Sequence, residues 1–156
     1  MKVLFLDIDG VLNSKRSAVA FNKFPWDVKP EDIPLFDLVA VALIRKVCKE
    51  THAKIVLSST WRHTVGWERV GQALDLPIID ATPTKINGKR GHEIEMWLER
   101  QCTRHPELQT TGITYAIVDD DSDMLEAQRP FFVQTDGENG LTLANYDALV
   151  KILGKI

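Results

Sequence analysis

Two aspartates, Asp7 and Asp9, follow an apolar segment at the start of the chain and are separated by one residue. If residues 3–8 form a strand, alternate side chains at its end point the same way, so both carboxylates can face one pocket. Like charges this close repel each other, and burial raises the cost of keeping them ionised. A divalent cation would relieve that cost, and Gly10 would let the chain turn sharply. The alternative is a strand that ends in solvated acids at a turn.

A second group of acids, Asp119, Asp120, Asp121 and Asp123, follows the apolar segment 114–118. Acids at a helix N-terminus are stabilised by the helix dipole, which explains some of the four. That explanation does not account for their position directly after a strand. A Walker B motif is excluded because the chain has no G-x-x-x-x-G-K-[ST] phosphate loop. Four carboxylates this close together would be costly without either a cation or full solvation.

Hydroxyl groups follow a third apolar segment. Ser58 and Ser59 come directly after the predicted strand 54–57. Hydroxyls and main-chain N–H groups at the end of a strand can bind phosphate oxygens, although serines in a loop are more often simple loop formers. Trp61, two residues further on, is expected to pack beneath this loop, and stacking on a substrate is the alternative.

A cation precedes one of the predicted helices. Arg90 stands directly before Gly91, where helix 91–104 is predicted to begin, and from there its guanidinium can neutralise a phosphate. Lys85 and Lys89 lie in the same loop and compete for this role. The alternative is a solvated basic turn. The four histidines have no spacing typical of a metal site.

The elements that would position these residues alternate along the chain. Strands are predicted at residues 3–8, 54–57, 77–79, 114–118 and 131–134. Helices are predicted at residues 35–49, with Pro34 near the first turn, and at 65–74, 91–104 and 143–153, the last capped by Thr142. We expect residues 10–34 to be irregular and Ser122 to cap a helix.

Strands separated by helices favour parallel pairing through right-handed crossovers. The predicted fold class is therefore α/β: a three-layer sandwich with a central, mostly parallel, Rossmann-like sheet, formed by residues 1–156 as a single domain. In such sheets the ligand site lies at the carboxyl ends of the strands. The acidic and hydroxyl groups described above all fall at those ends.

Composition limits the classes of function. The chain has 156 residues, 44% hydrophobic and 26% charged, with a net charge of −3, so a strongly basic nucleic-acid-binding surface is not expected. The apolar N-terminus is short and carries two aspartates, which fits neither a signal peptide nor a membrane span. We expect a cytoplasmic protein in which Cys48 and Cys102 stay reduced.

The motifs together resemble those of the haloacid dehalogenase (HAD) superfamily. The segment L-D-I-D-G-V-L at residues 6–12 is similar to its first motif, and Asp119 with Asp123 has the D-x-x-x-D spacing of its fourth. The serines after residue 57 are similar to the second motif, and Lys89 or Arg90 to the third. All four occur in the order found in the family.

The resemblance implies a mechanism. Asp7 would attack phosphorus and form an aspartyl-phosphate, and Asp9 would act as general acid and then as general base. The implied ligands of Mg²⁺ are Asp7, the main-chain carbonyl of Asp9, Asp119, and Asp120 or Asp123 in support. The implied phosphate-binding residues are Ser58, Ser59 and Arg90.

Within the superfamily, the chain resembles the small HAD domain of RNA-repair proteins. The similarity rests on L-S-S-T-W-R at residues 57–62 and on R-G-H-E-I-x-x-W-L at residues 90–98. Neither residues 11–34 nor residues 80–112 are long enough for a large cap domain, so we expect a small or absent cap and an open site. Such a site suits a nucleotide or the phosphorylated end of a polynucleotide. A metal-dependent nuclease and a non-catalytic module that sequesters a phosphorylated ligand remain as alternatives, and the sequence does not give the oligomeric state.

Overall fold

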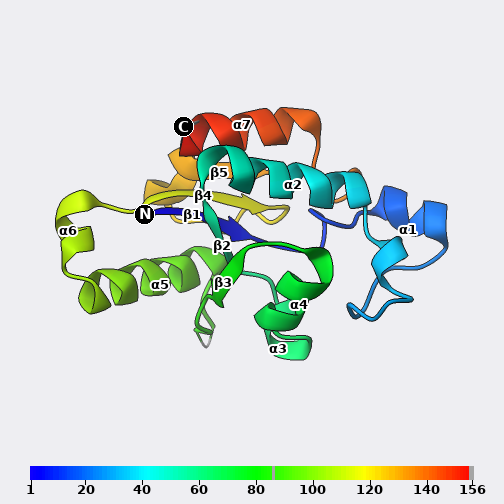
Figure 1. The fold of residues 1–156 in the computed structure, drawn as a ribbon, viewed down its shortest axis with the longest axis horizontal. Coiled ribbons are helices and arrows are strands. Elements are labelled where there is room, and N and C mark those ends of the chain that lie inside the picture. Colours follow the sequence, from blue (N-terminus) through cyan, green and yellow to red (C-terminus); the bar gives the residue numbers. More distant parts are fainter. Residues whose placement is uncertain (86, 155–156) are drawn as a thin grey trace.

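The computed structural model describes residues 1–85 and 87–154. Five strands pair in parallel in the order β3-β2-β1-β4-β5, with β1 in the centre (Figure 1). The strands are β1 (Lys2–Leu6), β2 (Lys54–Leu57), β3 (Ile78–Ala81), β4 (Thr114–Asp119) and β5 (Phe132–Gln134). The α-helices are α1 (Lys15–Phe21), α2 (Leu38–Thr51), α3 (Trp61–Thr64), α4 (Trp67–Leu74), α5 (Arg90–Arg104), α6 (Glu107–Thr111) and α7 (Leu143–Leu153). Two 3-10 helices are η1 (Ile33–Leu35) and η2 (Glu126–Phe131).

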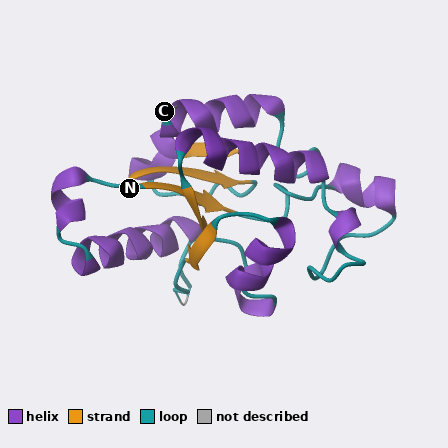
Figure 2. Ribbon diagram, viewed as in Figure 1, coloured by secondary structure: helices purple, strands orange, loops and turns teal. Residues whose placement is uncertain are grey.

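Helices cover both faces of the sheet and make three layers, as Figure 2 shows. Leu4 and Leu6 of β1 point into a core that they share with apolar residues of α2, α4 and α7. Val3 and Phe5 point to the opposite face, where they pack against α5. Because β1 is buried on both faces, its sequence is continuously apolar instead of alternating. The predicted three-layer α/β sandwich with a parallel sheet is confirmed.

The carboxyl ends of the central strands meet at one edge of the sheet. Leu6 pairs with Leu57 of β2 on one side and with Val118 of β4 on the other. The parallel pattern continues for one step beyond β1, where the N–H of Asp7 donates to the carbonyl of Val118 at 3.1 Å. The polar residues that follow these three strands are therefore brought together by strand register.

Three predicted features are wrong. Residues 15–21 form α1, where an irregular segment was expected, because Ser14 and Ser17 make a reciprocal capping box. Helix α2 begins at Leu38 and not at 35, since the Asp37 carboxylate caps its first N–H groups. Ser122 was expected to cap a helix, but no helix begins there. It follows a bend in which the carboxylate of Asp119 accepts the N–H of Asp121 at 3.0 Å.

The segments that could carry a cap are short. Between β1 and α2 lie loops, α1 and η1, and between β3 and α5 lies a loop of residues 82–89, of which residue 86 is outside the described part. Within the ranges that the structure describes, neither insert forms a separate cap domain, as expected. No helix in those ranges is both long enough and apolar enough to cross a membrane.

Candidate active site

Asp7 lies at the centre of the polar edge, one residue past the end of the middle strand. Its side chain is buried, and that burial is the largest influence on its pKa, which is raised above the ordinary value. The Arg90 guanidinium, the Ser59 hydroxyl and the main-chain N–H of Ile8 act in the opposite direction. The contacts with these groups offset only part of the cost of burying the carboxylate. A buried acid that destabilises the fold in this way is typical of functional sites.

Asp119 and Asp120 bring two more carboxylates to Asp7. One oxygen from each of the three residues lies within 4.8 Å of the others. Burial and the charge of Asp7 raise the pKa of Asp119 to about 7, and the same two causes raise the pKa of Asp120. Gly10 permits this approach, because a side chain at that position would collide with Asp120, and its φ of +76° also favours glycine.

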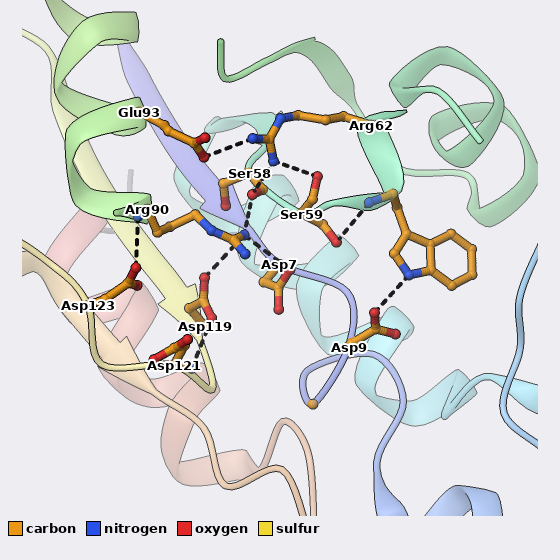
Figure 3. A network of polar contacts seen from close by, with 12 residues as sticks. Asp7, Asp9, Ser58, Ser59, Arg62, Arg90, Glu93, Asp119, Asp121 and Asp123 are labelled. Carbon is orange, nitrogen blue, oxygen red and sulfur yellow. Dashed lines mark hydrogen bonds and ion pairs between the residues drawn. The ribbon is translucent and has the colours of Figure 1, made fainter. Parts of the chain in front are cut away.

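The guanidinium of Arg90 is the counter-charge of this cluster. Nη1 lies 3.2 Å from Oδ1 of Asp7 and 3.3 Å from Oδ2 of Asp119, and it also donates to the carbonyl of Ser58 (Figure 3). Burial alone would lower the pKa of Arg90, but the charges of Asp7 and Asp119 raise it. Of the three basic residues proposed for phosphate binding, Arg90 therefore faces the cluster, whereas Lys85 and Lys89 are exposed.

Asp123 holds Arg90 in place. The Asp123 carboxylate accepts the main-chain N–H of Arg90 at 2.9 Å, at the N-terminus of α5 where a negative charge is favourable. Gly91 lets this end of α5 approach closely: a side chain there would lie 2.6 Å from the main-chain nitrogen of Leu125. Gln128 fixes the same contact by donating to the carbonyl of Gly91 at 2.7 Å. Asp123 thus positions the arginine, and its carboxylate does not join the group formed by Asp7, Asp119 and Asp120.

The side chain of Asp9 also points away from the three clustered carboxylates. The indole Nε1–H of Trp61 donates to Oδ2 of Asp9 at 3.1 Å (Figure 3). The amide of Asn13 donates to Oδ1 of Asp9 at 2.9 Å. Asn13 is buried and its own Oδ1 accepts the N–H of Gly10, so the turn and the carboxylate are fixed together. Asp9 itself stays exposed, where it can reach a bound molecule.

Trp61 therefore has two roles. It is buried and its ring packs against Phe36 at 5.6 Å between centroids, which confirms the predicted packing beneath the loop. Its bond to Asp9 was not predicted. A buried indole N–H usually has a hydrogen-bond acceptor, but the acceptor cannot be identified from sequence alone.

The two serines are both buried and differ in their partners. The Ser59 hydroxyl accepts the N–H of Trp61 at 3.3 Å and interacts with Asp7. The Ser58 hydroxyl has no hydrogen-bond partner among the described residues. A buried hydroxyl without a partner costs free energy, so a phosphate oxygen at this edge would supply the missing bond.

A buried ion pair beneath the site was not predicted from the sequence. Arg62 donates to the carbonyls of Ser58 and Ser59, both at 2.8 Å, and pairs with Glu93 of α5 at 2.8 Å (Figure 3). The side chains of Arg62 and Glu93 are only 6% and 9% exposed. This pair ties the loop after β2 to the helix that carries Arg90. Both residues belong to the segments that resemble the RNA-repair HAD domains, and this resemblance is the only sequence feature that pointed to them.

The donor set suits a hard divalent cation. The oxygens of Asp7, Asp119 and Asp120 converge, and no described histidine or cysteine joins them. Oδ2 of Asp119 is buried and lies 3.3 Å from Nη1 of Arg90, but it accepts no hydrogen bond from the described residues. Oxygen ligands favour Mg²⁺ over zinc. The residues present therefore fit the cation that the motifs imply.

Comparison with known proteins identifies the family. Residues 3–146 match the family model described as the HAD domain in Swiss Army Knife RNA repair proteins. Neither the search of curated proteins nor the search of solved structures found a match. The matched range includes every residue of the edge described above, from Asp7 to Asp123. The chain therefore belongs to the HAD domain family of Swiss Army Knife RNA repair proteins, and so to the HAD-type hydrolases.

Proposed function

We propose that the protein is a Mg²⁺-dependent phosphomonoesterase that acts through an aspartyl-phosphate on Asp7. The observation that carries this proposal is the difference in environment between the two aspartates of the first motif. Asp7 is buried against a carboxylate cluster and a guanidinium, whereas Asp9 is held apart by Trp61 and Asn13 with its carboxylate exposed. A nucleophile and an acid need such different surroundings.

The first half-reaction transfers the phosphoryl group to the protein. An oxygen of Asp7 attacks phosphorus, and the bond between phosphorus and the ester oxygen breaks. Asp9 gives its proton to the departing oxygen, which leaves as an alcohol. Arg90 and the hydroxyls of Ser58 and Ser59 bind the phosphate oxygens while negative charge develops on them. The Arg90 guanidinium, now on Asp7 and Asp119, has to turn towards the substrate for this step.

The second half-reaction restores the enzyme. Asp9, now ionised, takes a proton from water, the water oxygen bonds to phosphorus, and the bond to Asp7 breaks to release inorganic phosphate. Mg²⁺ would be held by Asp7, the main-chain carbonyl of Asp9, Asp119 and Asp120, and when bound it neutralises carboxylate and phosphate charge. Asp123 supports the site by holding the start of α5.

The proposed substrate is a phosphorylated nucleotide or nucleic-acid end. Two observations support this class: the family occurs in RNA repair proteins, and the described inserts form no cap domain over the strand ends. We further propose that residues 1–156 act as one catalytic domain in the cytoplasm. The free state of both cysteines supports a reducing compartment.

Phosphate release from an aryl phosphate and from phosphorylated oligonucleotides tests the proposal. We expect activity with Mg²⁺, little with Ca²⁺, whose larger size displaces the phosphorus from Asp7, and none in EDTA. Asp7→Asn should abolish turnover and leave the circular dichroism spectrum unchanged, because asparagine has nearly the same shape but is a poor nucleophile. Internal cleavage of the oligonucleotide would favour a nuclease, and binding without turnover would favour a sequestering module.

A further inference from the structure

A hollow opens directly beside the proposed acid. It has a volume of about 300 Å³ and is lined by Asp9, Gly10, Asn13, Ser14, Phe24, Pro25, Trp26, Asp120 and Gly137. Asp9 and Asp120 thus border both this hollow and the reacting centre. In the proposed reaction, Asp9 protonates the oxygen of the leaving alcohol. The part of the substrate that leaves should therefore lie on the same side as the hollow.

Two of the residues that line this hollow, Phe24 and Trp26, are aromatic and exposed to solvent. Trp26 is 75% exposed and Phe24 is 40% exposed, whereas Trp61 and Trp97 are buried. Exposing rings of this size to water costs free energy, and clusters of them beside a cavity are typical of binding sites. The indole N–H of Trp26 donates to no residue that the structure describes, so it is available to a ligand.

The segment that carries these rings is anchored on both sides of Trp26. Pro25 and Val28 are buried. Asp27 accepts a hydrogen bond from Arg69 at 3.1 Å and from the main-chain N–H of Val28 at 2.8 Å. Trp26 therefore lies in a loop whose neighbouring residues are buried or hydrogen-bonded, while its own side chain is exposed.

The charges around the hollow determine which chemical groups it can bind. The ionisable residues that line it are both acidic, Asp9 and Asp120, and none of the described lysines or arginines does so. A second phosphate group would be repelled there, whereas an uncharged aromatic group would gain stacking on the rings. The volume suits one nucleoside. A base and its sugar are the uncharged part of a nucleotide that carries a single terminal phosphate.

We propose that Trp26, with Phe24, stacks the base of the nucleotide whose phosphate is removed, and so selects nucleotides over other phosphate esters. This inference rests on the proposed phosphatase activity for its chemistry. The inference itself concerns a binding site for the nucleoside, and nucleoside binding can also be measured without turnover.

The first test compares kcat/KM for adenosine monophosphates, with the phosphate at the 3′ or the 5′ position, with kcat/KM for ribose 5-phosphate. Trp26→Ala should lower the ratio of nucleotide to sugar phosphate on the order of tenfold, as for loss of one base stack. Trp26→Phe should keep most of the ratio because a ring remains. Phe21→Ala is the matched control, since Phe21 is also an exposed aromatic residue but borders a different hollow, on α1. Equal losses on both substrates in Trp26→Ala would overturn the inference.

The second test separates this inference from the proposed function. Calorimetric titration with adenosine, which has no phosphate, should give binding to the wild-type protein that Trp26→Ala weakens and Phe21→Ala does not. If no ester were hydrolysed but this pattern held, the proposed activity would fail and the nucleoside site would stand. If esters were hydrolysed but adenosine bound equally to the wild type and Trp26→Ala, or to neither, the nucleoside site would be wrong.

Discussion

At the scale of single residues, the site is a set of acids whose surroundings differ. Asp7 and Asp119 share one guanidinium, and burial raises the pKa of each. Asp9 has an indole and an amide as partners and stays exposed. These differences, and not the presence of aspartates alone, are the basis of our proposal that the nucleophile and the acid are separate residues.

Asp9→Asn should slow the hydrolysis of an alkyl phosphate much more than that of an activated aryl phosphate. The aryl leaving group needs little protonation, so its departure depends less on the acid. Burst kinetics on both substrates measure the phosphorylation step separately from hydrolysis of the intermediate. An equal loss of burst rate on the two substrates would show that Asp9 is not the acid.

Arg90→Ala should weaken inhibition by phosphate or vanadate more than Lys85→Ala does. Arg90 faces the carboxylate cluster, whereas Lys85 is exposed and its main-chain N–H bonds to Glu93. Removing one partner of a buried charge pair costs about 2–5 kcal/mol, so the inhibition constant should rise at least about 30-fold. Lys85→Ala is the control on the same loop. A larger effect in that variant would transfer the role to Lys85.

At the scale of elements, the site depends on how the loop after β2 meets the start of α5. Arg62 bonds to two carbonyls of that loop and to Glu93 of the helix, and Asp123 bonds to the first N–H of the helix. The strand ends fix one side of the site by register. The helix that brings Arg90 is held by these side-chain contacts instead.

Glu93→Gln should lower the free energy of unfolding by about 3 kcal/mol, because it leaves Arg62 charged and buried without its partner. Arg62→Met should also destabilise the protein, and the double variant should lose less than the sum of the two. Urea denaturation of the four proteins gives this coupling energy directly. A coupling near zero would mean that the ion pair does not hold the loop against the helix.

Sequence patterns predicted the elements whose signal is local. The apolar runs located the strands, and parallel pairing followed from the alternation with helices, so the meeting of Asp7, Ser58 and Asp119 at one edge was expected. Helix α1 was missed because its reciprocal cap uses two serines, where the usual signal has an acidic or amide residue at the second position.

Contacts between distant parts of the chain could not be predicted in the same way. The bond from Trp61 to Asp9 joins residues 52 positions apart, and the pairing of Arg62 with Glu93 depends on how α5 packs. Asp123 illustrates the same limit. Its spacing from Asp119 predicts support for the metal. In the structure its Oδ2 accepts the first N–H of α5, and its Oδ1 is buried without a hydrogen-bond partner among the described residues. Spacing identifies a motif, but tertiary packing decides what each residue contacts.

At the scale of the whole molecule, the clustered carboxylates make stability depend on pH. The pKa of Asp119 is raised from its ordinary value of 3.8 to about 7, so the folded protein keeps a proton that the unfolded chain loses in this range. The unfolded state therefore binds fewer protons, and the free energy of unfolding falls as pH rises from about 4 to 7. The loss is at most about 4 kcal/mol for this group.

Asp119→Asn should remove part of that pH dependence. In EDTA at pH 8 the variant should be more stable than the wild type, and its advantage should shrink at pH 5. Asp121→Asn, which changes an exposed acid of the same segment, is the control and should follow the wild type. Urea denaturation at the two pH values measures both. If the free energy of unfolding of Asp119→Asn and of the wild type changed equally with pH, Asp119 would not be the source of the pH dependence.

The proposed mechanism requires that Asp7 becomes phosphorylated during turnover. The direct measurement is to quench the reacting protein with acid, reduce any acyl-phosphate with borohydride and sequence the peptides by mass spectrometry. We expect conversion of Asp7 to homoserine only when substrate and Mg²⁺ are both present, and no such conversion at Asp9 or Asp119. Turnover with an unmodified Asp7, or with the modification on another aspartate, would contradict it.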